Sequence, residues 1–177
     1  MQALCNFTGY TKHDDALLSG SVDLGITASS PADRTLGHAP IATERLVPVA
    51  TPQWVEQHAG HSQTLRAVRT SPAVSYDRDL ALISRALEAE GLRTDDLRPS
   101  IVVPDLLSVR DLVREGAGWS VIPDYLVEHH LATGDLIRLR TRSALIKNTL
   151  YLVWLKTALR HPRVSFARQI VLESFGK

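Results

Sequence analysis

The stretch that most constrains this fold is PDLLSVRDLVREGAGWSVIP, residues Pro104–Pro123. It opens with a helix signal, because Ser108 can cap a helix and Asp111 stands three residues later, in the acidic position of a capping box. The apolar residues that follow are spaced by three and four, which places them on one helical face: Val109, Leu112 and Val113. The stretch therefore predicts a helix with one apolar face.

Glycines end this helix and start the next element. Gly116 stands where a left-handed C-cap belongs, and Gly118 allows the backbone to turn tightly. Trp119–Ile122 is typical of a short buried strand that Pro123 ends, and Asp124 can cap a second helix. The order helix, glycine turn, strand, helix is the repeating unit of an α/β sheet.

The same order of parts occurs near the start of the chain, in DDALLSGSVDLGIT. An apolar helical segment, Ala16–Leu18, leads to Gly20, and Val22–Thr27 follows as a strand. Two such units far apart in the sequence suggest two similar α/β lobes. A chain of 177 residues is long enough to bury a core in one domain or in two small lobes.

Periodicity predicts the remaining elements. The expected strands are Gln2–Tyr10, Glu44–Thr51, Pro72–Ser75, Ser100–Val103, Leu136–Leu139 and Thr149–Leu155. The expected helices are His13–Ser19, a short one that starts at Pro52, Asp79–Glu90, Asp124–Ala132 and His161–Phe175. Within the second of these strands, Pro48 cannot donate a ladder hydrogen bond, which argues for a sheet edge or a bend there.

Four segments, in this order, carry a resemblance to a known family: LLSGSVDLGI, PIATERLVPVATPQW, SVRDLVREGAGWSVIPDYL and GDLIRL. They are similar to the effector-binding domain of LysR-type transcriptional regulators, and they cover nearly the whole chain from about Ala16 onward. The resemblance implies an α/β, two-lobed fold like that of type 2 periplasmic binding proteins. It implies a discontinuous lobe I at residues 1–63 and 145–177, and a lobe II at residues 64–144.

The resemblance also implies parts that precede these segments in a complete regulator. Regulators of this family begin with a helix-turn-helix and a long linker helix, and their effector domain begins with a strand and a helix that come before the one expected at Gln2–Tyr10. We therefore expect a chain truncated at its N-terminus, whose lobe I lacks its first strand and helix. DNA would be bound only through a module absent from this chain, and the full-length regulator would be a homo-oligomer.

Residues that follow the predicted strands are the candidate ligand-binding residues, because open α/β sheets bind ligands beyond the carboxyl ends of their strands. In the family these positions line the cleft between the lobes: Thr27, Ala28, Ser29, Ser75, Tyr76, Val103, Pro104, Asp105 and Ser108. Short hydroxyl side chains suit a small polar effector, and the free amides of a helix N-terminus suit an anionic one. Each hydroxyl residue is as readily an ordinary turn former, and for Ser108 helix capping is the commoner role.

Composition and spacing argue against several other classes of protein. A formal net charge of +1 offers no basic surface for nucleic acid, and a single cysteine cannot form an internal disulfide. No apolar run approaches a membrane span and no signal peptide is recognisable, so we expect a cytoplasmic protein without a membrane partner. We expect no cofactor and no metal, because zinc needs three or four convergent ligands and the adjacent His129 and His130 diverge on a helix.

The leading hypothesis is a non-catalytic sensor of a small-molecule effector. A stand-alone solute-binding protein would have the same fold, but the signal peptide expected of a periplasmic receptor is not recognisable. An enzyme on this fold is the third class, since a fold does not fix a function. No GxSxG elbow, P-loop or nucleophile–base pair supports that third class.

Overall fold

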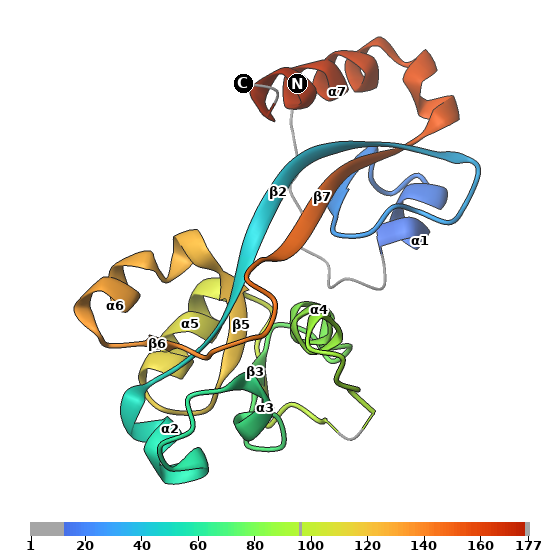
Figure 1. Ribbon diagram of the computed structural model, residues 1–177. Helices are drawn as coiled ribbons and strands as arrows, with labels where there is room; N and C mark the ends of the chain where they lie inside the picture. Colours follow the sequence, from blue (N-terminus) through green and yellow to red (C-terminus); the bar gives the residue numbers. More distant parts are fainter. Residues whose placement is uncertain (1–12, 96, 176–177) are drawn as a thin grey trace. The chain divides into compact units, whose positions relative to one another are not determined.

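The computed structural model describes residues 13–95 and 97–175 (Figure 1). The strand expected at Gln2–Tyr10 lies outside the described residues. The chain forms two compact units: unit 1 comprises Met1–Thr43 and Thr149–Lys177, and unit 2 comprises Glu44–Asn148.

Unit 1 is built on antiparallel strands and the C-terminal helix. β1 pairs with β7 so that Leu24 lies opposite Trp154 and Thr27 opposite Tyr151, and β7 lies between β1 and β2 in the sheet. Figure 1 shows β2 and β7 as the two long strands of the fold. The elements of this unit are α1 (His13–Leu18), β1 (Leu24–Thr27), the first part of β2 (Leu36–Ala50), most of β7 (Ile146–Leu155), the 3₁₀ helix η3 (Lys156–Arg160) and α7 (Pro162–Phe175).

The indole of Trp154 organises the packing of unit 1. A Cβ at Gly37 would lie 2.5 Å from the ring nitrogen of Trp154, so only glycine lets β2 approach the ring this closely. The guanidinium of Arg168, from α7, lies 4.1 Å from the centre of the same ring, a cation–π contact. Apolar neighbours complete this cluster: Ile41, Leu152, Val171 and Leu172.

Unit 2 holds the larger sheet region and most of the helices. The second part of β2 pairs antiparallel with both β5 and β6, whereas β3 and β4 form a parallel pair. Its other elements are α2 (Pro52–Ala59), α3 (Leu65–Val68), β3 (Val74–Ser75), α4 (Ala81–Ala89), β4 (Ile101–Val102), α5 (Leu106–Arg114), β5 (Ser120–Pro123), the 3₁₀ helix η2 (Asp124–Leu126), α6 (Glu128–Thr133) and β6 (Ile137–Arg138).

Two apolar clusters lie on opposite sides of these strands, because successive strand residues point to opposite faces. Leu46 of β2 and Val121 of β5 belong to the cluster that contains Ile83 and Leu87 of α4. The neighbouring strand residues, among them Val47 and Ile122, belong to the cluster of α5 and α6: Val109, Val113 and Leu131. Helices therefore cover both faces of the strands, as expected for an α/β fold.

Helix α5 begins earlier than predicted. Its N-cap is Asp105, whose carboxylate accepts hydrogen bonds from the Ser108 amide and hydroxyl, both at 2.7 Å. Ser108 therefore lies in the first turn of the helix, and its predicted role as the cap is wrong. A carboxylate at Asp105 can accept from two donors of the same residue, whereas a hydroxyl at Ser108 would shorten the helix.

Glycine is needed at the two positions after α5 for different structural reasons. Gly116 has φ +79°, so the predicted left-handed turn is confirmed. Gly118 has no positive φ. A Cβ there would lie 2.6 Å from the carbonyl oxygen of Pro72, so the close approach of two backbones requires glycine at this position.

One of the two alternatives for Pro48 and the prediction for Asp124 are also corrected. Pro48 stands inside the sheet, opposite Val121, and its carbonyl accepts from the Leu139 amide at 2.9 Å, so a sheet edge at Pro48 is excluded, while the bend stays a prediction. Asp124 caps no helix. Asp124 is the first residue of the 3₁₀ helix η2, and its carboxylate forms an ion pair with Arg45 rather than capping the helix.

The compact units begin and end at other residues than the predicted lobes. Trp54 and Val55 of α2 are buried in the core of unit 2, and residues 44–63 therefore pack with the residues predicted for lobe II. Lobes are defined by their motion and not by compactness alone, so the predicted lobe boundaries stay a prediction.

Candidate functional site

The carboxyl ends of the parallel strands β3 and β4 form a candidate site of unit 2. Val74 lies opposite Ile101 and Ser75 opposite Val102, and the Val103 amide donates to the Ser75 carbonyl at 3.0 Å. Each strand leads into the N-terminus of a nine-residue helix, β3 into α4 and β4 into α5. Ends of this kind are where open α/β sheets bind ligands.

After β3, the chain places a buried carboxylate at the start of α4. Ser75 is buried, and its hydroxyl accepts from the Asp77 amide at 3.3 Å. Asp77 is 7% exposed, and its Oδ1 accepts from the Ala81 amide at 3.2 Å. Its Oδ2 is buried without a hydrogen-bond partner among the described residues. Leu80, just before the helix, has φ +58°, a conformation that costs energy in a non-glycine residue.

After β4, a second carboxylate stands at the start of α5. Hydrogen bonds from the Ser108 hydroxyl and amide lower the pKa of Asp105, so this exposed carboxyl is ionised at neutral pH. Pro104 beside it is exposed and Val103 is half-buried. At each of the two helix N-termini, one amide therefore already donates to a carboxylate of the chain itself.

Tyr76 joins the site to both cores of unit 2. Its side chain is half-buried and packs against the cluster of α4 and the cluster of α5. An aromatic ring held from two sides gives the strand ends a fixed apolar wall. The structure therefore brings the predicted residues of unit 2 into one neighbourhood: Ser75, Tyr76, Val103, Pro104, Asp105 and Ser108.

The predicted residues of unit 1 form a turn at the end of β1. The Ser29 amide donates to the Thr27 hydroxyl at 3.2 Å, and that hydroxyl lies 3.3 Å from the Ser29 carbonyl, to which it donates. Ala28 is buried, with 2% of its surface exposed. The role of these three residues in a cleft shared with unit 2 stays a prediction.

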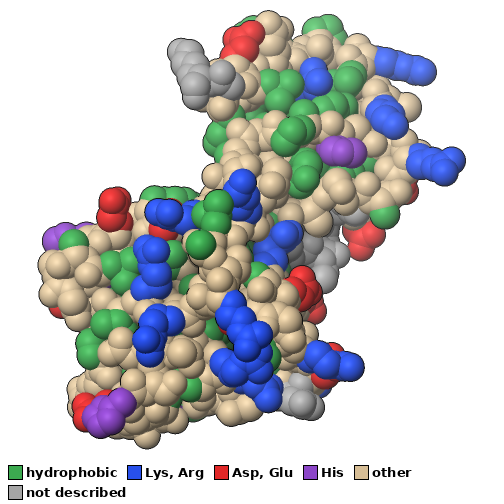
Figure 2. Space-filling view, viewed as in Figure 1, with side chains coloured by type: hydrophobic (Ala, Val, Ile, Leu, Met, Phe, Trp, Pro, Cys, Tyr) green, Lys and Arg blue, Asp and Glu red, His purple; other side chains and the backbone are tan. Residues whose placement is uncertain are grey.

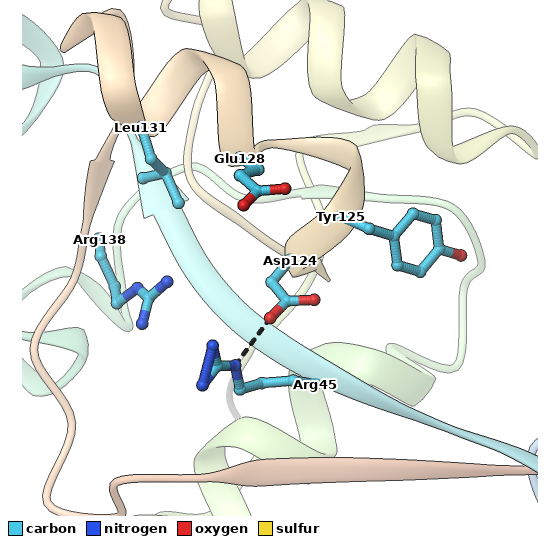
Figure 3. Close-up of a pocket in the computed structure, with 6 residues that line it drawn as sticks. All are labelled: Arg45, Asp124, Tyr125, Glu128, Leu131 and Arg138. Carbon is cyan, nitrogen blue, oxygen red and sulfur yellow. Dashed lines mark hydrogen bonds and ion pairs between the residues drawn. The ribbon is translucent and has the colours of Figure 1, made fainter.

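Sequence reasoning missed a cavity of about 210 Å³ on unit 2 (Figure 3). Figure 3 shows the Arg45 and Asp124 side chains pointing toward each other, and Arg45 Nε donates to Asp124 Oδ2 at 2.7 Å. The pair joins β2 to η2 across 79 residues of sequence, so no local signal could have revealed it. The cavity is lined by Arg45, Asp124, Tyr125, Glu128, Leu131 and Arg138.

Tyr125 anchors the same region through Glu44. Its hydroxyl donates to Glu44 Oε1 at 2.8 Å, and Asn148 Nδ2 donates to Glu44 Oε2 at 2.8 Å. Partial burial, together with the hydrogen bond and negative charge of Glu44, raises the pKa of Tyr125 to about 12. The three side chains link η2 to the residues at which β2 enters and β7 leaves unit 2.

Within the part of the chain that the structure describes, no three His, Cys, Asp or Glu side chains gather closely enough to hold a metal ion. A search of that same part for a helix long and apolar enough to span a membrane finds none.

Comparison with known proteins decides the family. Residues 8–176 match the LysR substrate binding domain. The chain belongs to this family. The resemblance inferred from the four sequence segments is thereby confirmed.

Two solved LysR-family structures share the fold. The C-terminal domains of a LysR family protein from Agrobacterium tumefaciens superpose with a TM-score of 0.75 at 21% identity, covering 94% of this chain and 78% of that one. Full-length LysG from Corynebacterium glutamicum with bound effector Arg gives a TM-score of 0.62 at 18% identity, covering 90% of this chain and 53% of that one. The predicted α/β fold of the periplasmic-binding-protein type is confirmed.

A curated relative is similar in sequence as well. The HTH-type transcriptional regulator AbaB of Streptomyces antibioticus is 28% identical over 158 residues, which cover 88% of this chain and 52% of AbaB. The chain therefore spans about half the length of this relative. AbaB is named as a transcriptional regulator and not as an enzyme.

Proposed function

We propose that this LysR substrate-binding domain is the non-catalytic, effector-sensing part of a cytoplasmic, oligomeric transcriptional regulator. The family and the relatives named as HTH-type regulators support this proposal. Effector binding would shift the population of two conformations, which requires a different affinity for each. DNA binding belongs, in this proposal, to a helix-turn-helix module and not to the residues described.

We place the effector at the carboxyl ends of β3 and β4. The observation that carries this placement is the pairing of Ser75 with Val102, which sets two strand ends and two helix N-termini side by side. Protein sites for small polar ligands typically combine an apolar or aromatic wall with a small number of polar groups that orient the ligand. Thr27, Ala28 and Ser29 remain proposed contributors from unit 1.

The charges at these strand ends favour a cationic group on the effector. An anion would need the free helix amides, but Asp77 and Asp105 already accept from the Ala81 and Ser108 amides. Both aspartates instead offer negative charge to an amine or a guanidinium. The anionic effector considered from the sequence is therefore the less favoured class. The Arg bound to LysG of Corynebacterium glutamicum is an example of the favoured chemistry.

Calorimetric titration tests the proposal with defined probes. We expect L-arginine or L-lysine to bind and L-glutamate not to bind at the same concentration. Asp105→Asn should weaken binding of the cationic probe about tenfold, because a charge-assisted hydrogen bond contributes on the order of 1.5–3 kcal/mol. Asp111→Asn, an exposed change farther along α5, is the matched control and should leave binding unchanged. Tighter binding of glutamate, or an equal effect of the two substitutions, would contradict the placement.

A further inference from the structure

A second cavity of unit 2, of about 400 Å³, gathers three arginines that form no ion pair with any described residue. It is lined by Thr64, Arg66, Glu90, Arg140, Thr141 and Arg142. None of these residues belongs to the strand ends proposed for the effector. We infer that this arginine cavity binds a small oxyanion that carries two or more negative charges, of the phosphate or polycarboxylate class.

The backbone brings the three arginines to the cavity from separate segments. The Arg140 amide donates to the Gln63 carbonyl at 2.7 Å, and the Arg140 carbonyl accepts from the Leu65 amide at 3.0 Å. This bridge sets Arg140 beside α3, which carries Arg66 and is capped by the Thr64 hydroxyl at 3.3 Å. The cavity is therefore fixed by ordered backbone, although its arginine side chains are exposed.

The segment that begins in β6 presents its arginines on one side. Leu139 is fully buried, while Arg138, Arg140 and Arg142 alternate with buried or half-buried residues and are themselves exposed. This period of two is that of an extended strand with one solvated face. Figure 2 shows Lys and Arg side chains gathered over unit 2 on the face in view.

The described residues do not balance the positive charge of the cavity. Among the described residues, the ion pairs of arginines involve Arg45, Arg93, Arg110, Arg114 and Arg163, and none involves the three arginines of the cavity. Three guanidinium groups are charged at neutral pH and repel one another when they converge. An anion between them removes that repulsion.

Glu90 is the acidic group of the cavity, and the backbone uses its carboxylate. Glu90 is 6% exposed, and its Oε1 accepts from the Arg142 amide at 2.5 Å and from the Ser143 amide at 3.3 Å. These hydrogen bonds hold the segment that carries Arg142. Glu90 therefore positions an arginine, while its own charge opposes the bound anion.

The local grouping of three guanidinium groups favours a small anion over a macromolecule. Guanidinium groups are planar forks that pair bidentately with phosphate or carboxylate oxygens. A cavity of about 400 Å³ is in the size range of small-molecule sites. Duplex DNA would instead need basic residues spread along its backbone, and the formal net charge of the chain is only +1.

NMR titration of the whole chain with inorganic phosphate tests the inference, against sodium chloride at matched ionic strength. We expect saturable shifts of the Arg140 and Arg142 amides, with a Kd on the order of millimolar because the side chains are exposed to solvent. The double variant Arg140→Gln, Arg142→Gln should raise that Kd at least tenfold. Arg160→Gln, which removes an exposed arginine of unit 1, is the control and should leave it unchanged. Citrate, titrated likewise, distinguishes a polycarboxylate site from a phosphate site.

A second variant separates anion binding from a structural effect. Glu90→Gln keeps an oxygen that accepts from the Arg142 amide but removes the opposing charge, so phosphate should bind several-fold more tightly. Weaker binding by Glu90→Gln, or phosphate shifts that do not saturate, would overturn the inference. So would arginine-dependent binding of random-sequence duplex DNA without saturable phosphate binding, because the surface would then be a nucleic-acid contact.

Discussion

Unit 2 and unit 1 differ in how their strands are buried. In unit 2, apolar residues of β2 and β5 alternate between two clusters, and helices cover both. In the described part of unit 1, the clusters are small, one around Leu17 and Val153 and the other around Trp154. Apolar burial is the main favourable term in folding. The comparison therefore predicts that unit 2 carries most of the stability, while unit 1 depends on two small clusters, one of them built around the indole of Trp154.

Large exposed apolar side chains occur in both units, among them Leu107 and Leu145 of unit 2, but unit 1 carries its share on fewer residues. In unit 1, Ile26 on β1 is 46% exposed. On α7, Ile170 is 46% exposed and Phe166 is 56% exposed. In unit 2, β5 is buried along its whole length. Segments with few buried contacts open more readily than the core, and this difference can be measured.

Gly118→Val should have the largest effect, because it strikes the core of unit 2. A Cβ at this position would lie 2.6 Å from the Pro72 carbonyl oxygen, and neither backbone can move without shifting β3 or β5. We expect a loss of about 3 kcal/mol or more in the free energy of unfolding, measured by urea denaturation. His129→Ala, on the exposed face of α6, is the control and should stay within about 0.5 kcal/mol of the parent. Equal midpoints for Gly118→Val and the parent would show that the close approach is not rigid.

Hydrogen exchange compares the two units directly. The amides of β5 should exchange at least about 100-fold more slowly than those of β1, because opening β1 exposes much less apolar surface. The measurement is mass spectrometry or NMR of the whole chain at neutral pH. Comparable protection of β1 and β5 would break the comparison and give unit 1 a stability that its described contacts do not explain.

Arg168→Ala should weaken unit 1 alone. The substitution removes a guanidinium 4.1 Å from the centre of the Trp154 ring, and an exchange of cation for methyl uncovers part of the indole. We expect a loss of about 1 kcal/mol, seen as faster exchange of β7 and a shift of the Trp154 fluorescence. Protection of β5 should not change. Arg160→Ala, an exposed arginine of the same unit, is the matched control, and an equal effect of both substitutions would deny the indole its organising role.

Local signals predicted most of the elements of unit 2. Gly116 has the positive φ predicted for it, α2 starts at Pro52 as predicted, and α4 lies within the predicted helix Asp79–Glu90. The start of α5 was misplaced because two residues three apart can both cap a helix, and only the geometry of the carboxylate chooses between them. The strand ends were predicted as a site because their position follows from strand order alone.

The rest of the candidate sites depends on contacts between distant residues. Arg45 meets Asp124 and Glu44 meets Tyr125 across 79 and 81 residues, so neither pair leaves a local pattern. The alternation of Arg138, Arg140 and Arg142 is visible in the sequence, but the sequence does not show which other residues these arginines lie beside. Only the bridge between Thr64 and Arg140 brings a third arginine from α3 to the same cavity.

The smallest expected effect concerns Tyr125, whose hydroxyl donates to Glu44 on β2. Glu44 and Asn148 of β7 lie at the end of unit 2. Burial and the carboxylate of Glu44 raise the pKa of Tyr125 from 10.0 to about 12. The folded chain therefore holds this proton more tightly than the unfolded chain. The stabilisation is fully present below about pH 10 and is lost as the pH rises toward 12.

Tyr125→Phe isolates this contribution. At pH 8 the variant should be less stable by well under about 1 kcal/mol, because solvent screens a side chain that is 60% exposed. The deficit should shrink between pH 10 and 12, where the parent loses its advantage. The absorbance of tyrosinate gives the decisive measurement, since the difference between the titrations of parent and variant is the titration of Tyr125 itself. A midpoint near 10 in that difference would show that Glu44 does not hold the hydroxyl in solution, and the anchoring of η2 at this end of unit 2 would have to come from Arg45 and Asp124 alone.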